Sequence, residues 1–585
     1  MARYRWASVT AGLVALMGTA TAIADRAASD EGSLQGTIAF SSLAPRGWNV
    51  YLLDRETGQT RQLTDHPALD YNANFTADAQ QVLFVSERDG NLELYRVGLD
   101  GGQPMRLTDD YALDDHAAPS PDGRKIAFVS TRQASGRPGR ADNAVYVMQA
   151  DGQSVERLSP ADAADYSPAW SPCGEWIAVA SGSGRSGGTA IFLMRSDGSQ
   201  RRRVVDNGGW PTFASDSERL FFHSRREGHW AIWQVNRDGS DLERITPAGT
   251  DAFTPRAAAG GGHLVLAVQR DGSRQIDLLD LETREFTPLT RESIDHWNPA
   301  ISPDARYVLY HKRTRGAATP NVERWSTPPD TDLQMLRVAG AFPSFSPDGQ
   351  QMVLTGGSFA RVDRMAVDGS QRETLFTGGS RSTFGLSWAS RGDWIAFSHG
   401  AVFAGATASV NLKRMRPDGS ELSLLTDDAG NNGFPSFSPD GRQLIFRSGR
   451  DGHKNLYLIN HDGTGLQRLT EGTWTDTMPS WSPTGDWIVF ASNREGNFDL
   501  WRIRPDGSDS TKVIGGGGRN NHPRVSPDGR WVVFTSQRAG YSAEEISLPR
   551  QPQPYGSLFL VQMDGTGLRR LTHNGWEDGT PAWGP

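Results

Sequence analysis

The sequence contains a single cysteine, Cys173, in 585 residues, so no disulfide can form within the chain. Exported proteins often gain stability from disulfides, and a protein without them depends on its hydrophobic core. After the first two dozen residues, no segment approaches the about 20 consecutive apolar residues that a transmembrane helix needs. We therefore expect no membrane span in the mature chain.

Clusters of basic residues are also scarce. The formal net charge is −8, and the only basic block is Arg201–Arg203, which lies beside a turn. Proteins that bind nucleic acids usually carry a basic face that neutralises phosphates. We therefore expect no nucleic acid among the partners.

Recognisable catalytic and metal-binding motifs are missing as well. The sequence has no P-loop, no His-Glu-x-x-His motif, no EF-hand loop and no Cys/His zinc pattern. Gly184–Gly188 matches G-x-S-x-G, but it lies in a Gly/Ser-rich hairpin insertion, whereas a nucleophile elbow joins a strand to a helix. We predict no catalytic residue, and Ser186 is not expected to be a nucleophile.

The N-terminus is typical of an export signal. Arg3 and Arg5 precede a small, apolar segment, and Ala22–Ala24 forms an A-x-A cleavage site. We predict that residues 1–24 are a signal peptide cleaved after Ala24, that residues 25–35 are a short linker, and that the protein is secreted or periplasmic. An uncleaved anchor is the alternative, although the apolar run is short for a span.

The rest of the sequence is an internal repeat of roughly 44 residues. Each copy has two apolar strands, Asp-Gly before Ser or Thr, a third strand ending in Leu-Thr, and then Pro-x-aromatic-Ser-Pro-Asp-Gly. In the last motif, intact at Ser120–Gly123 and Ser438–Gly441, proline and glycine supply the backbone angles of a tight turn. Four strands per repeat at this period predict a propeller blade. Twelve copies begin near residues 37, 82, 126, 177, 220, 264, 308, 352, 395, 444, 488 and 532.

This repeat resembles the PD40, or WD40-like, propeller repeat of the TolB family and of prolyl-oligopeptidase-type proteins. The resemblance covers about residues 36–585 and implies an all-β fold of twelve four-stranded blades. TolB-like proteins add an α/β domain and the peptidases add a hydrolase domain. We expect neither, because blades account for nearly the whole mature chain.

The phase of the repeat predicts how the blades are grouped. The chain starts on the second strand of a blade and stops on an innermost strand, which suits a ring closed by its last strand. We predict two tandem six-bladed propellers, residues 36–303 and 304–585. Seven plus five blades, or a return of the C-terminal strand to the first propeller, are the alternatives.

The loops that lead into the innermost strands predict the binding sites, because they lie at one mouth of each channel. Their aspartates could instead bond loop backbone N–H groups, and their tryptophans could be buried between blades. The predicted rim of the first propeller is Asp115, His116, Asp165, Asp251, Asp295, His296, Trp297 and Asn298. The predicted rim of the second is Asn431, Asn432, Trp474, Asp476, Asn521, His522, Trp576 and Asp578.

Two functions fit these features. The first is a non-catalytic binding or scaffold protein for a protein or glycan partner, with no cofactor, since rigid platforms of loops suit such partners. The alternative is an enzyme acting on a saccharide in a channel, similar to oligogalacturonate lyases. That reading would need a divalent metal, which His66, His116 and His296 could hold.

Overall fold

The computed structural model describes residues 34–133, 143–182, 189–316, 319–401, 409–428, 430–538, 556–574 and 576–585. Within these residues the regular structure consists of 48 β-strands in twelve sheets of four. The predicted all-β fold of twelve four-stranded blades is therefore confirmed. The described part of the chain holds no helix that could cross a membrane. The predicted signal peptide, nearly all of the predicted linker and Ser186 lie outside the described residues.

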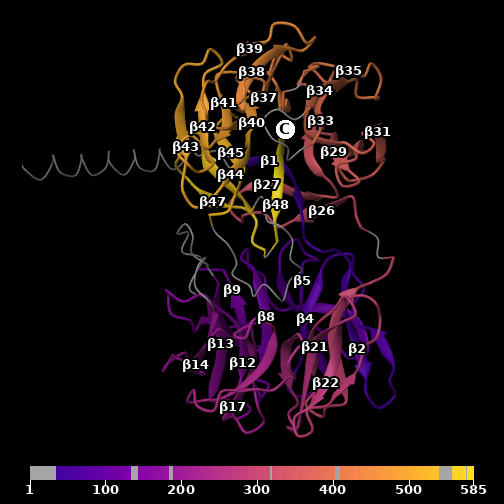
Figure 1. Ribbon diagram of the computed structural model, residues 1–585, viewed down its shortest axis with the longest axis vertical. Helices are drawn as coiled ribbons and strands as arrows, with labels where there is room; N and C mark the ends of the chain where they lie inside the picture. Colours follow the sequence, from indigo (N-terminus) through magenta and orange to yellow (C-terminus); the bar gives the residue numbers. More distant parts are fainter. Residues whose placement is uncertain are drawn as a thin grey trace, which may run out of the picture.

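The innermost strands of the blades contact one another in two closed circles of six, the first ring and the second ring. In Figure 1 the first ring forms the lower lobe, in indigo to magenta, and the second ring the upper lobe, in orange and yellow. The innermost strands of the first ring are β4 (Asp70–Phe75), β8 (Asp114–Pro119), β12 (Asp165–Trp170), β16 (Gly209–Phe213), β20 (Ala252–Ala257) and β24 (His296–Ile301). Those of the second ring are β28 (Ala341–Phe345), β32 (Ser382–Trp388), β36 (Gly433–Phe437), β40 (Asp476–Trp481), β44 (Asn520–Val525) and β48 (Asp578–Gly584).

Ten blades are built from four consecutive strands, and the other two are shared between distant segments. In the first ring, β24 and β25 (Tyr307–Arg313) are completed by β2 (Trp48–Asp54) and β3 (Thr60–Gln62). In the second ring, β48 pairs with β1 (Gln35–Ser42), which pairs in parallel with β27 (Asp332–Val338), and β26 (Val322–Trp325) lies outermost.

This pairing corrects the predicted boundaries of 36–303 and 304–585. The strand β1, expected in the first propeller, belongs to the second ring (Figure 1). The strand β25, expected in the second propeller, belongs to the first ring. The first ring is thus inserted between two strands of the second. The repeat phase could not show this exchange, because both strands have the same apolar pattern and either could accompany either innermost strand.

The turns of the blades follow from their sequence. In Ser120–Gly123, the hydroxyl of Ser120 donates to Asp122 at 2.6 Å and accepts the N–H of Lys125 at 2.9 Å. Gly123 closes the turn with a φ of 71°, a conformation that disfavours other residues. The turns of this type lie at one end of each ring, called the turn face. The loops that lead into the innermost strands form the opposite end, the loop face.

Candidate functional site

A bulge interrupts the pairing of each innermost strand, and one residue at the bulge has a left-handed backbone with φ between 44° and 59°. This residue occupies the position before the proline of the repeat. We call these twelve residues the axial residues. In the first ring they are Asn72, His116, Ser167, Trp210, Thr254 and Asn298, and in the second ring Phe342, Gly385, Phe434, Met478, His522 and Thr580.

Three axial residues of the first ring, Asn72, His116 and Asn298, form a buried polar network with Asp115. Asn298 donates to Asn72 at 2.7 Å, and Asn72 donates to Asp115 at 2.9 Å. His116 packs against Trp210, two blades away, with ring centroids 4.9 Å apart. Burial raises the pKa of Asp115, but His116 and the donated hydrogen bonds outweigh it and hold that pKa below its ordinary value. The network therefore holds a buried carboxylate that stays charged.

Three of the residues predicted for the first rim meet in this network: Asp115, His116 and Asn298. The other aspartates bond to their own surroundings. Asp165 forms an ion pair with Arg201 at 2.6 Å, while Asp251 and Asp295 accept the backbone N–H groups of Trp230 and Arg274. These contacts match the structural role that the sequence also allowed for such aspartates.

The three histidines considered for a metal have different surroundings. His116 belongs to the axial network, His66 accepts the N–H of Ala68 at 3.1 Å, and His296 contacts the carbonyl of Arg274 at 3.3 Å. Burial and the charge of Lys312 lower the pKa of His296. Among the described residues, no group of three or more His, Cys, Asp or Glu side chains is arranged to hold a metal ion.

The axial residues of the second ring form an aromatic triangle instead. Phe342, Phe434 and His522 come from alternate blades, and their ring centroids lie 5.6–5.9 Å apart. Gly385 leaves room for the triangle, because a Cβ atom there would lie 2.9 Å from the Cα of Phe434. Burial and the charge of Arg524 lower the pKa of His522 to about 3, so this imidazole is neutral. The triangle closes the channel at this level.

Most residues predicted for the second rim serve local contacts. Asn431 accepts a hydrogen bond from Arg447, and Asn432 accepts one from Ser448 at 2.6 Å. The hydroxyl of Thr535 donates to the carbonyl of Asn521 at 3.1 Å, and the amide of Asn574 donates to Asp578 at 2.9 Å. Burial raises the pKa of Asp578. His522 differs from these residues because it is axial, and Trp474 differs because it is partly exposed.

A repeated arginine contact was missed by the sequence reasoning. The arginine two residues after the last serine of a second strand donates to that serine, and in every copy except Ser224–Arg226 it also reaches the start of the innermost strand. Arg88 bonds Ser86 and Asp70, and Arg494 bonds Ser492 and Asp476. A Ser-x-Arg pattern marks this contact, and we call it the arginine clamp. Its copies are Ser86–Arg88, Ser130–Arg132, Ser224–Arg226, Ser448–Arg450, Ser492–Arg494 and Ser536–Arg538.

The two rings meet at a junction that uses two predicted rim tryptophans. Trp48 stacks on Trp297 of the first ring at 5.7 Å and meets Trp576 of the second ring edge-on at 6.3 Å. Both Trp297 and Trp576 are buried. Their rings are therefore occupied by the contact between the rings.

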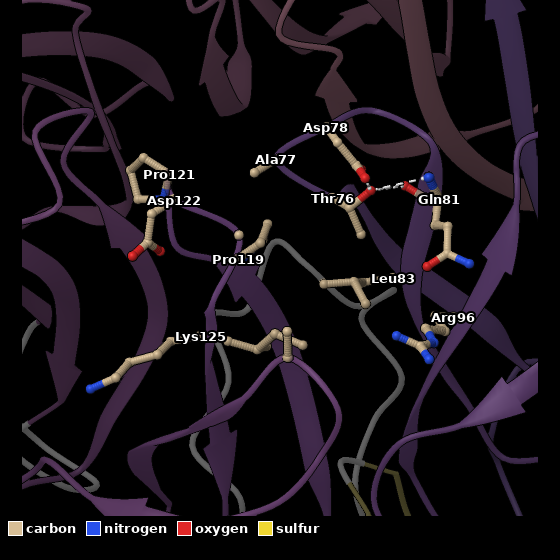
Figure 2. A pocket seen from close by; sticks show the side chains of 13 residues that line it. Thr76, Ala77, Asp78, Gln81, Leu83, Arg96, Pro119, Pro121, Asp122 and Lys125 are labelled. Carbon is tan, nitrogen blue, oxygen red and sulfur yellow. Dashed lines mark hydrogen bonds between the residues drawn. The ribbon is translucent and has the colours of Figure 1, made fainter.

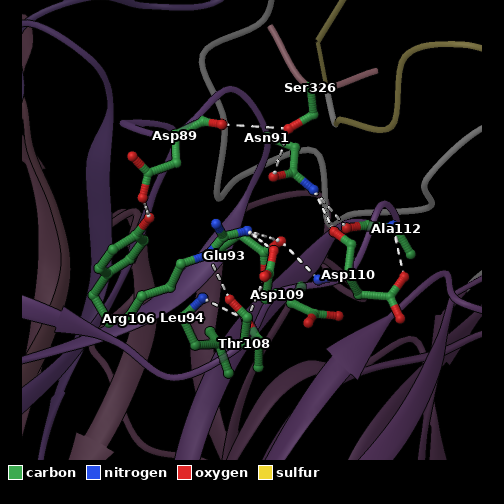
Figure 3. Close-up of polar contacts among 12 residues, drawn as sticks. Asp89, Asn91, Glu93, Leu94, Arg106, Thr108, Asp109, Asp110, Ala112 and Ser326 are labelled. Atoms are coloured by element: carbon green, nitrogen blue, oxygen red, sulfur yellow. Dashed lines mark hydrogen bonds and ion pairs between the residues drawn. The ribbon is translucent and has the colours of Figure 1, made fainter. Parts of the chain in front are cut away.

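Polar contacts extend the junction, as Figure 3 shows. Ser326 of the second ring donates to Asn91 of the first ring at 3.4 Å, and Asn91 donates to the carbonyls of Asp110 and Ala112. Below them, the buried Glu93 accepts a hydrogen bond from Arg106 at 2.9 Å. A polar network of the first ring thus continues into the second.

A cavity of about 500 Å³ opens on the turn face between the blades that begin with β4 and β8 (Figure 2). Thr76, Asp78, Gln81, Arg96 and Lys125 are among its lining residues. Thr76 donates to Asp78 at 2.6 Å and accepts the N–H of Gln81 at 3.0 Å, so these groups stabilise the turn. The cavity lies on the face opposite to the predicted rims.

Comparison with known sequences gives one family. The model of the TolB beta propeller domain, PD40, matches residues 33–138, 140–327 and 361–552. An uncharacterised protein of Agrobacterium fabrum is 27% identical over 151 residues, 24% of this chain and 50% of that protein. The Tol-Pal system protein TolB of Wolinella succinogenes is 32% identical over 68 residues, 12% of this chain and 16% of that protein. The chain spans half or less of the length of these relatives.

Solved structures give a likeness of fold alone. A TolB of Agrobacterium tumefaciens covers 46% of this chain and 99% of its own, with 21% identity and a TM-score of 0.39. The match to the tricorn protease covers 85% of this chain and 49% of the protease, with 13% identity and a TM-score of 0.33. The match to an oligogalacturonate lyase in complex with manganese covers 73% of this chain and 97% of the lyase, with 14% identity and a TM-score of 0.30. At such scores the likeness carries no functional argument.

Proposed function

The chain belongs to the TolB β-propeller (PD40) family, and from this premise we propose that it is a non-catalytic binding or scaffold protein for a protein partner. The partner binds the loop face of the second ring, around Trp474. The protein acts outside the cytoplasm, as a secreted or periplasmic protein, in keeping with the predicted export signal. A fold shared by many functions does not decide among them, so the proposal rests on the site.

The observation that carries the proposal is the filling of both axes at the level of the axial residues. The first ring is occupied by the network of Asn72, His116 and Trp210, and the second by the triangle of Phe342, Phe434 and His522. An enzyme acting in a channel needs an open space beside its reacting groups. Filled axes favour binding at the outer loops, because loops on a rigid scaffold are common binding surfaces.

Trp474 has the features of an anchor for a partner. Its ring is partly exposed on the loop that leads into β40. Its indole N–H donates to Asp476 at 3.3 Å, and Arg494 lies 5.4 Å from the ring centroid, so the ring is held in place. Tryptophan and arginine are enriched among the residues that dominate protein interfaces, and a fixed ring loses little entropy on binding.

The proposal is tested by affinity capture with the purified protein and a Trp474→Ala variant. Extracts of the periplasm and culture fluid of the source organism supply the partner, which is then produced and titrated against both proteins. We expect the variant to bind at least about tenfold more weakly, which is typical for the loss of an interface tryptophan. Leu424→Ser is the matched control, since Leu424 is exposed on an outermost strand of the same ring.

Several outcomes would reject the proposal. Equal binding by the wild type and Trp474→Ala would exclude the loop face around this ring. Selective binding of a glycan, measured on a glycan array, would show that the partner is a glycan and not a protein. Turnover of a saccharide that depends on added metal would support the channel enzyme instead.

A further inference from the structure

The innermost strands of the second ring carry a row of small polar residues two positions after the axial residues. Each position lies between the triangle and the turn face, because the strands run from the loop face to the turn face. Four successive blades have serine here, and the fifth has arginine. The row consists of Ser344, Ser387, Ser436, Ser480, Arg524 and Ala582.

The first ring has a different set at the equivalent positions, although it also has an arginine in its fifth blade. Arg256 pairs with Val265 just as Arg524 pairs with Val533. The remaining positions contain no serine. The full set is Asn74, Ala118, Ala169, Thr212, Arg256 and Ala300.

Three of the second-ring serines present hydroxyl hydrogens that no group among the described residues accepts. The hydroxyl oxygen of Ser344 accepts the backbone N–H of Trp388 in the next blade at 2.9 Å. In the same way, Ser387 accepts the N–H of Phe437 at 3.1 Å. Ser436 accepts the N–H of Trp481 at 3.3 Å. These bonds fix the oxygens between neighbouring innermost strands. Within the described residues the three hydroxyls donate to no acceptor, and all three side chains are partly exposed. The wall therefore offers hydrogen-bond donors.

Arg524 adds a positive charge to this wall. Among the described residues, its one hydrogen bond runs to the carbonyl of Pro523 at 3.4 Å, and no carboxylate there forms an ion pair with it. Protein surrounds the guanidinium, yet part of the residue stays accessible. Burial lowers the pKa of Arg524 to about 10. A charge taken from water in this way favours a counter-ion.

A second arginine lies on the other side of the triangle. Arg447, on β37 (Gln443–Ser448), is 4% exposed, and within the described part of the chain it donates only to the neutral side chains of Asn431 and Thr477. Its Nε–H finds no acceptor among these residues. Burial lowers the pKa of Arg447 to about 9, and burial together with Arg447 lowers that of Lys454 to about 8. Positive charge therefore extends along the axis of this ring.

We propose that the second ring binds an oxyanion group, a carboxylate or a phosphate, between Arg524 and the hydroxyls of Ser344, Ser387 and Ser436. Planar guanidinium groups and hydroxyl donors together match the oxygens of such groups. The site opens on the turn face, and the triangle of Phe342, Phe434 and His522 separates it from the loop face. It is therefore distinct from the partner site proposed above and does not depend on it.

The test is a titration of the full chain with sodium phosphate, sodium succinate and neutral succinamide at constant ionic strength, followed by calorimetry and by the unfolding temperature. We expect at least one of the two oxyanions to bind and to raise the unfolding temperature, and succinamide to do neither. Arg524→Gln should weaken binding at least about tenfold, since it removes a charged donor. Arg256→Gln, the equivalent position of the first ring, is the matched control and should bind like the wild type.

The double variant Ser387→Ala with Ser436→Ala keeps the test decisive if Arg524→Gln does not fold, and we expect it to weaken binding several-fold. Binding of succinate alone identifies a carboxylate, and binding of phosphate alone identifies a phosphate. Absence of binding by both oxyanions would overturn the proposal. So would equal affinity in the wild type and the second-ring variants, and so would a loss caused equally by Arg256→Gln.

Discussion

Arg337 of the second ring donates a hydrogen bond to Glu87 of the first ring at 2.7 Å. The two side chains are 1% and 0% exposed, so this ion pair is cut off from water. Glu323 accepts a second hydrogen bond from Arg337 at 2.7 Å and lies 3.2 Å from Arg46. Burial raises the pKa of Glu87, which Arg337 partly opposes. The cluster joins the two rings by charge as well as by packing.

Removing one partner of this cluster should destabilise the whole protein. In Arg337→Met, Glu87 remains buried without its counter-charge, and we expect a loss of about 3–5 kcal/mol in the free energy of unfolding. Urea unfolding followed by tryptophan fluorescence measures it. Arg324→Met on the neighbouring strand β26 is the control, because Arg324 is exposed, and a change within about 0.5 kcal/mol is expected. A double variant with Glu87→Gln should regain much of the loss, and a double variant as unstable as Arg337→Met would contradict this account.

The arginine clamps should differ in strength according to the group that they hold. Arg88 bonds the buried carboxylate of Asp70, whereas Arg538 bonds the neutral amide of Asn520 at 2.9 Å. Both arginines lie over a phenylalanine at similar distances, 5.4 and 5.6 Å. We expect Arg88→Gln to cost at least about 2 kcal/mol more than Arg538→Gln, since only the first leaves a buried charge alone.

The pH dependence separates charge from packing in this comparison. The excess cost of Arg88→Gln should shrink as the pH falls, because Asp70 becomes protonated and no longer needs a counter-charge. Chemical unfolding of both variants at neutral and mildly acidic pH measures the difference. If the extra loss in the free energy of unfolding of Arg88→Gln stayed constant with pH, it would come from lost packing and not from charge.

The repeat made most of the fold predictable. Turn motifs such as Ser120–Gly123 fixed the ends of the strands, and the period fixed four strands per blade. The exchange of β1 and β25 was not predictable, because pairing between segments about 300 residues apart leaves no local pattern in either strand. The parallel pairing of β1 with β27 is likewise a property of the assembled blade.

The site was predictable to a smaller extent. The position that usually precedes proline led to His116, Asn298 and His522, which lie among the axial residues. It could not distinguish residues that meet at the axis from those that hold loops, such as Asp251 and Asp295, since both kinds share one motif. Nor could it show that Trp297 and Trp576 meet at the junction, because that contact exists only once the rings are placed together.

Glu93 should make the stability of the first ring depend on pH. Burial, and to a lesser degree the charge of Asp114, raise the pKa of Glu93 from 4.5 to about 7, and burial raises that of Asp114 to about 6. The folded state therefore holds protons that the unfolded state releases, so the free energy of unfolding should fall as the pH rises from about 4.5 to 7. Glu93→Gln cannot release a proton and should show a shallower fall. Thermal unfolding across this range checks it, with the exposed Glu471→Gln as control, and parallel profiles for wild type and Glu93→Gln would refute it.

The insertion of the first ring between β1 and β26 has a consequence for the order of assembly. Every strand of the first ring lies between residues 48 and 313, so this ring can be completed as soon as that segment has left the ribosome or the export channel. The second ring needs both β1 and β48, strands from the two extremes of the described chain, and closes last. Until β27 and β48 are available, both edges of β1 remain unpaired beside the completed first ring. A chaperone that shields such an edge would act on this intermediate and on one strand of it.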